Sequence, residues 1–85
     1  MRMKSKSDFY SQFLKRVIDR RKELRIKQEA LALYLGYKSR SSISKIESGV
    51  NDIPVSKIEL LANALRTTPE YLMGFTESKN QQKGE

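Results

Sequence analysis

The stretch from Gly36 to Gly49, GYKSRSSISKIESG, constrains the fold of this chain more than any other segment. It is typical of a short helix between two glycines, yet five of its fourteen residues are serine. Only Ile43 and Ile46 are strongly apolar. Serine is a mediocre helix former and two isoleucines contribute little core, so the polar side of this helix needs an explanation.

Apolar residues at helical spacing along the rest of the chain predict an all-α fold of five short helices, without a β-strand pattern. We expect helices over Asp8–Arg25, Gln28–Leu35, Arg40–Ser48, Val55–Leu65 and a short last helix that begins at Thr68-Pro69-Glu70 and ends before Gly74. Ser7 or Asp8 is placed to cap the first helix, Ser39 the third and Thr68 the last.

Two charged residues fall on faces that the periodicity turns inward. The stripe of the first helix that contains Phe13, Leu14 and Val17 also contains Arg21. On the third helix, Glu47 lies beside Ile46 on the inward side. A charge on an apolar face needs a partner, because burying it alone is costly.

Composition narrows the class of function. The chain has 85 residues, enough for one small domain, and a formal charge of +7 from 17 Lys and Arg against 10 Asp and Glu. This excess favours a polyanionic partner, nucleic acid or an anionic membrane surface, although simple solubilisation is the alternative. The absence of cysteine and histidine argues against disulfides, metal sites, cofactors and enzymatic activity, and favours the reducing cytoplasm. No apolar run is long enough to span a membrane.

The second and third expected helices, joined by a turn containing Gly36, have the pattern of a helix-turn-helix. One side of the third helix carries a continuous polar stripe of Arg40, Ser41, Ser44, Lys45 and Ser48. Short serine side chains let a helix lie close to a groove, while arginine and lysine can reach guanine acceptors or phosphates. An ordinary solvated face would also be rich in serine and lysine.

Between Phe13 and Gly74 the sequence resembles the Cro and lambda-repressor type of helix-turn-helix protein, the XRE family. The matching residues are Gln28, Leu31, Ala32, Gly36, Ile43, Ile46, Glu47 and Gly49, then LANAL at 61–65 and PEYLMG at 69–74. The phrases GYKSRSSISKIESG and NDIPVSKI look most like repressors of temperate phages and related mobile elements. The resemblance implies a compact lambda-repressor-like domain with its helix-turn-helix at helices 2 and 3.

The resemblance also implies residue roles. Base edges would be met by Arg40, Ser41, Ser44 and Lys45, and phosphates by Lys27, Gln28, Lys38, Ser39 and Asn51. Arg21 and Glu47 match a buried ion pair that ties the first helix to the recognition helix.

The chain departs from the family pattern at two places. Its turn from Gly36 to Ile43 is one residue longer than usual, which leaves Lys38 or Ser39 as the cap. Asn51-Asp52 follows the recognition helix where relatives often carry basic residues, and Asp52 would repel a phosphate. We therefore expect weaker binding of the DNA backbone at this loop, or binding through its main-chain N–H groups.

We expect a flexible basic N-terminal arm at 1–7, the DNA-binding domain at 8–75, and a disordered tail or linker at 76–85. A homodimer on DNA would use the last helix, with contacts from Tyr71, Leu72, Met73 and Phe75. An oligomerisation or regulatory domain absent from this chain would follow the linker.

The sequence thus predicts a sequence-specific regulator that binds double-stranded DNA, a phage-type repressor on an inverted-repeat operator. The alternative is an antitoxin or protein-binding adaptor on the same fold. A nuclease is disfavoured because the chain has no histidine and no clustered carboxylates.

Overall fold

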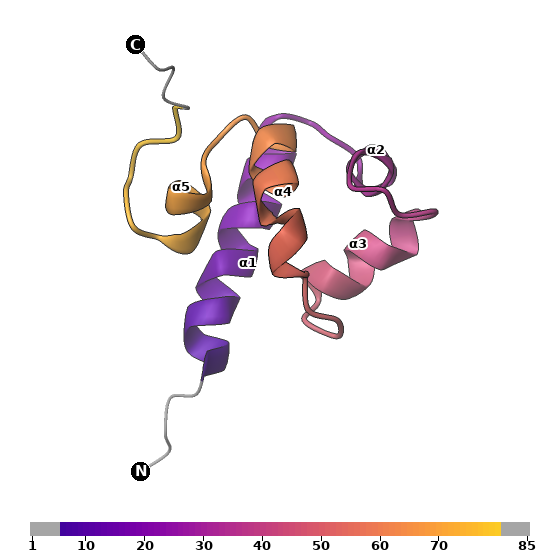
Figure 1. Ribbon diagram of the computed structural model, residues 1–85, viewed down its shortest axis with the longest axis horizontal. Coiled ribbons are helices and arrows are strands. Elements are labelled where there is room, and N and C mark those ends of the chain that lie inside the picture. Colours follow the sequence, from indigo (N-terminus) through magenta and orange to yellow (C-terminus); the bar gives the residue numbers. More distant parts are fainter. Residues whose placement is uncertain (1–5, 81–85) are drawn as a thin grey trace.

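The computed structural model describes residues 6–80 and confirms the all-α prediction (Figure 1). Within these residues there is no strand. The helices are α1 (Lys6–Glu23), α2 (Gln28–Tyr34), α3 (Arg40–Glu47), α4 (Ile58–Ala64) and α5 (Pro69–Met73), with one 3-10 turn, η1 (Val55–Lys57), directly before α4. The helix-turn-helix is formed by α2 and α3, as expected.

Both ends of α1 and the start of α4 differ from the sequence prediction by two residues or more. α1 begins at Lys6, so Asp8 lies in its first turn and is not its N-cap; an acid there still benefits from the positive end of the helix. The side chain of Ser7, the other expected cap, lies outside the described residues. The expected helix 55–65 is split, because the chain leaves Pro54 as a 3-10 turn and becomes α-helical only at Ile58. Of the expected arm and tail, residues 1–5 and 81–85 lie outside the described residues.

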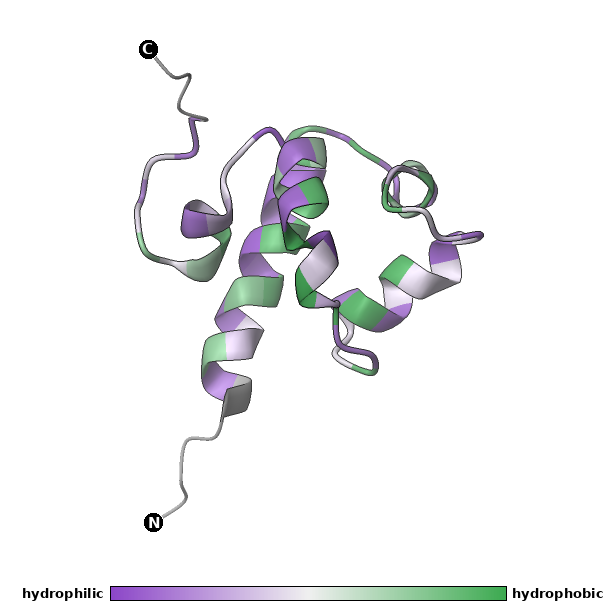
Figure 2. Ribbon diagram, in the orientation of Figure 1, coloured by the Kyte–Doolittle hydropathy of each residue, from purple (hydrophilic) through white to green (hydrophobic). Residues whose placement is uncertain are grey.

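The core is the place where the inner faces of all five helices meet. Hydrophobic and hydrophilic residues alternate around each helix in Figure 2, as expected for helices with one buried face. The buried residues are Phe13, Leu14, Val17, Leu31, Ala32, Leu35, Ile43, Ile46, Ile53, Leu61, Ala62, Leu65 and Leu72. Ile53, which the helical periodicity does not include, reaches this core from the loop between α3 and α4.

All five α-helices end in the same way. After each one, a backbone N–H bonds the carbonyl five residues earlier: Ile26 to Arg21, Tyr37 to Ala32, Val50 to Lys45, Thr67 to Ala62 and Phe75 to Glu70. The residue before each donor is left-handed, with φ of 87° at Gly36, 85° at Gly49 and 87° at Gly74, but 60° at Arg25 and 56° at Arg66. A side chain in this conformation costs about 1–2 kcal/mol, which glycine avoids.

The helices divide into two groups around α1 and α4. Figure 1 places α2 and α3 on one side of these central helices, and α5 with the segment after it on the other. Among the described elements, α5 packs against α1 and α4 and not against α2 or α3. None of the described helices is long and apolar enough to cross a membrane.

Candidate nucleic-acid interface

The turn between α2 and α3 is held from outside by a lysine. Lys57 of η1 donates from Nζ to the carbonyl of Leu35 at 2.8 Å, and the same Nζ lies 5.1 Å from the centroid of the Tyr37 ring. The cation thus binds the C-terminal end of α2, where carbonyls lack helical partners. Sequence reasoning missed Lys57, because its partner is a backbone carbonyl 22 residues away.

α3 buries one face and exposes the other. Ile43 and Ile46 are 2% and 5% exposed. The opposite side presents the α3 stripe, five exposed residues: Arg40, Ser41, Ser44, Lys45 and Ser48. Ser39 is at the N-cap position, but its hydroxyl bonds the Ser41 hydroxyl at 2.9 Å and not a backbone N–H of the helix. The helix therefore starts where expected without the expected side-chain cap.

An ion pair joins α1 to α3. Arg21 Nε lies 2.7 Å from Glu47 Oε2, and Arg21 Nη2 lies 3.1 Å from Glu47 Oε1. The side chains are 12% and 8% exposed. Arg21 Nη1 also donates to the carbonyl of Ile26 at 2.9 Å, in the loop that leads to α2. One guanidinium thus fixes α3 and this loop together, in the two-pronged geometry that makes arginine–carboxylate pairs specific.

Gln28 extends this contact to the outer surface of α3. Its Nε2 donates to Glu47 Oε1 at 2.9 Å, while its Oε1 accepts from Arg40 Nη1 at 3.2 Å. Arg21, Glu47, Gln28 and Arg40 therefore form one chain of hydrogen bonds, the polar bridge, which runs from α1 to the start of the α3 stripe. Helical periodicity placed Arg21 and Glu47 inward. It could not predict that Gln28 connects them to Arg40, because that contact depends on how α2 packs against α3.

A shallow, mostly basic hollow lies where α2 and α3 meet. Its volume is about 420 Å³ and its lining is Arg21, Lys27, Gln28, Glu29 and Arg40. Lys27, at the N-cap position of α2, is exposed. Because Glu47 already neutralises Arg21, the cations left in the hollow are Lys27 and Arg40, against the carboxylate of Glu29. With a glutamine amide that keeps one free N–H, they form a suitable environment for a phosphate.

The residues that flank α3 are arranged less favourably for phosphate binding. Lys38, Ser39 and Asn51 are exposed. After α3, however, the N–H groups of Val50 and Asn51 both donate to the carbonyl of Lys45, at 2.9 and 3.1 Å. Of the two expected alternatives for this loop, phosphate binding by main-chain N–H groups is disfavoured at Val50 and Asn51, since helix termination uses both donors.

The surface expected to form a dimer needs one correction. Leu72 is fully buried in the core of its own chain, so it is not available to a partner. Tyr71 and Met73 are half-buried, while Phe75 is 74% exposed. Leu72 falls inside because α5 docks on α1 and α4, which the sequence pattern of so short a helix does not reveal.

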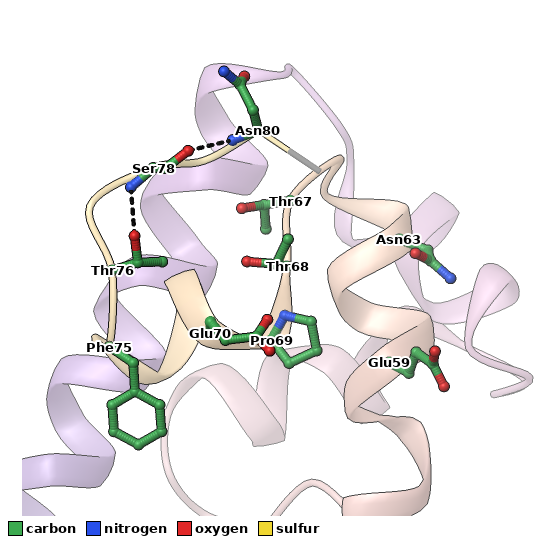
Figure 3. Close-up of a pocket in the computed structure, with 10 residues that line it drawn as sticks. All are labelled: Glu59, Asn63, Thr67, Thr68, Pro69, Glu70, Phe75, Thr76, Ser78 and Asn80. Carbon is green, nitrogen blue, oxygen red and sulfur yellow. Dashed lines mark hydrogen bonds between the residues drawn. The ribbon is translucent and has the colours of Figure 1, made fainter. Parts of the chain in front are cut away.

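A larger hollow, of about 570 Å³, lies on the opposite side of the molecule, between α4, α5 and the segment that follows them (Figure 3). That segment turns through a bond from Ser78 N–H to the Thr76 hydroxyl at 3.2 Å. The lining includes Glu59 and Glu70 and no lysine or arginine, which disfavours a phosphate there. Within residues 6–80 no group of three or more His, Cys, Asp or Glu could hold a metal ion.

Comparison with known proteins agrees with this geometry. A family model described as helix-turn-helix matches residues 17–72, a span that runs from α1 into α5. Comparisons with curated proteins and with solved structures give no match. The family match covers well over half of the 85 residues. The chain belongs to the Cro/C1-type helix-turn-helix (XRE) family of DNA-binding regulators.

Proposed function

We propose that this protein is a sequence-specific transcriptional repressor of the phage type, which binds double-stranded DNA with α3 in the major groove. One observation carries the proposal: α3 buries only Ile43 and Ile46 and leaves the α3 stripe exposed. A B-DNA major groove admits an α-helix and presents a distinct pattern of donors and acceptors for each base pair.

Arg40 and Lys45 are the residues with the reach to read bases. A guanidinium has five N–H donors, and Gln28 takes one of those on Arg40, so the others remain for guanine N7 and O6. Ser41 and Ser44 are short enough to let the helix lie close to the base edges, where their hydroxyls add hydrogen bonds. Because the polar bridge holds Arg40 before DNA arrives, less side-chain entropy is lost on binding.

Phosphates would be held around the basic hollow and the turn. Lys27 and the remaining amide N–H of Gln28 face the backbone that α2 crosses in this motif. Lys38, Ser39 and the side chain of Asn51 flank α3 at its two ends. These contacts fix the register of the protein on the duplex but carry no sequence information themselves.

A homodimer on an inverted repeat follows from the size of the reading surface. One α3 covers only a few base pairs, so two copies related by a twofold axis would be needed for useful specificity. Phe75, with the exposed parts of Tyr71 and Met73, is the candidate dimer contact.

Selection of bound duplexes from a random DNA pool tests the proposal. We expect enrichment of one motif with inverted symmetry, its half-sites about 10 base pairs apart or a multiple of that distance. Enrichment of a single asymmetric half-site would contradict the dimer but not the base readout. A pool that remains random after selection, at a salt concentration where duplexes still bind, would contradict sequence-specific recognition.

A further inference from the structure

The corner between α1 and α2 contains an exposed arginine at the helix-end position that glycine occupies after α2 and α3. Arg25 has a φ of 60°, in the left-handed region, and its side chain is exposed. Within residues 6–80 its guanidinium has no hydrogen-bond or ion-pair partner. The same helix ending forms with glycine at Gly36 and Gly49, so the backbone at this turn does not require a side chain. Arg66 has the same conformation after α4, so this conformation follows from the helix ending and does not by itself indicate a function.

The charges around Arg25 point to an anionic partner. Lys22, one turn earlier, and Lys27, two residues later, are also exposed and have no ion-pair partner among the described residues. Two nearby carboxylates are already engaged: Glu47 binds Arg21, and Glu23 accepts hydrogen bonds from Arg20 and Lys79, which hold the pKa of its carboxyl below the ordinary value. The third, Glu29, is exposed beside Lys27 in the hollow, and the cations around the corner outnumber it.

This corner continues the basic hollow. Lys27 belongs to both, because it lines the hollow together with Gln28 and Arg40. Figure 1 shows the loop after α1 running toward α2, on the side of the molecule where α3 lies. A duplex that lies along α3 and the start of α2 would therefore bring its backbone past this corner.

We propose that Arg25 is a DNA-backbone contact and that, together with Lys22 and Lys27, it extends the phosphate-binding surface from the basic hollow onto the α1–α2 corner. The proposal rests on the proposed DNA-binding function. It adds to the footprint a residue outside the helix-turn-helix itself, one that grips the duplex without reading its sequence.

Arg66 provides a matched control. It is also an exposed arginine after a helix, with a φ of 56°, and it has the same favourable position at the negative end of a helix. Its loop, between α4 and α5, runs to the side of the molecule away from α2 and α3 (Figure 1). Arg25→Gly and Arg66→Gly thus remove the same charge and relieve the same backbone conformation at two different corners.

The experiment measures the affinity of both variants and the wild type for the selected duplex and for a scrambled one, between 0.05 and about 0.2 M salt. For Arg25→Gly we expect a salt slope shallower by about 0.9 and affinities for both duplexes roughly five- to tenfold lower at 0.1 M salt. Arg66→Gly should match the wild type, and Arg25→Lys should retain most of the slope. Thermal melting should show neither glycine variant less stable than the wild type.

Two results would overturn this inference and leave the proposed DNA-binding function intact. The first is an Arg25→Gly slope equal to those of Arg66→Gly and the wild type. The second is a melting temperature lowered by Arg25→Gly but not by Arg66→Gly, which would give the side chain a structural role. A wild type that binds neither duplex would instead contradict the proposed function itself, and the inference with it.

Discussion

The two sides of the molecule are held together by different forces. On the α4–α5 side, Leu61, Leu65 and Leu72 are 2%, 0% and 0% exposed, and apolar burial fixes the helices. On the α2–α3 side, the recognition helix buries only two isoleucines and is fixed instead by the polar bridge and by Lys57 at the turn.

The difference follows from how much helix surface each side must leave exposed. A helix that enters a groove keeps a wide polar face, so little of its surface remains for burial. The hydrogen bonds of the polar bridge compensate for this small burial, because an arginine–carboxylate pair fixes orientation as well as distance. The recognition helix should therefore be sensitive to the loss of single polar groups, and the α4–α5 side to the loss of volume.

The largest loss of stability is expected from a cavity on the α4–α5 side. Leu65→Ala removes a fully buried side chain and should lower the free energy of unfolding by about 3–4 kcal/mol. Urea denaturation measures this, with Leu33→Ala as the control, since Leu33 is 62% exposed. Similar losses for the two variants would mean that Leu65 is not part of the core.

On the α2–α3 side, Glu47→Ala should have nearly as large an effect. It leaves Arg21 inside without its counter-charge and removes an acceptor from Gln28, at a cost of about 3 kcal/mol. The control is Glu59→Ala, which removes an exposed carboxylate from α4. Equal melting temperatures for the two variants would show that the ion pair is solvated and that α3 is held by burial after all.

Lys57→Met tests the clamp on the turn. Methionine has a similar length but cannot donate, so the half-buried carbonyl of Leu35 loses its lysine donor, at a cost of about 1–2 kcal/mol. Lys15→Met is the comparison, because the ion pair of Lys15 with Asp19 is exposed and contributes about 0.5 kcal/mol or less. Equal melting temperatures for the two variants would show that the turn does not depend on Lys57.

The smallest expected loss of stability comes from the N-cap residues. It should differ between Thr68, whose side chain bonds its helix, and Ser39, whose side chain does not. The Thr68 hydroxyl accepts from the N–H of Tyr71 at 3.1 Å, so Thr68→Ala should destabilise the fold by about 1 kcal/mol. Ser39→Ala should change stability little, since the Ser39 hydroxyl bonds only Ser41. A larger loss for Ser39→Ala would indicate a side-chain cap on α3 in solution.

The sequence predicted what depends on local periodicity and missed what depends on placement. The two faces of α3, the inward positions of Arg21 and Glu47, and the Thr68 cap all follow from spacing over a turn or two of helix. The Gln28 bridge and the Lys57 clamp join residues 12 to 22 positions apart, and no short pattern encodes such partners.

Two further predictions, the exposure of Leu72 and the end of α1, were wrong because neither is set by helical periodicity. Leu72 lies inside because of how a five-residue helix docks, which its own sequence is too short to indicate. α1 ends at Glu23, two residues early, because Arg25 adopts a conformation that is uncommon for any residue except glycine.

The central claim, that the exposed face of α3 reads bases while the start of α2 grips the backbone, is tested most directly by affinity for the selected and the scrambled duplex at two salt concentrations. We expect Arg40→Ala and Lys45→Ala to weaken the selected duplex by about 1–3 kcal/mol and the scrambled one much less. Lys27→Ala should weaken both alike and make the salt slope shallower by about 0.9. If Arg40→Ala and Lys45→Ala instead lower both affinities by the same factor, α3 does not read sequence and the account is contradicted.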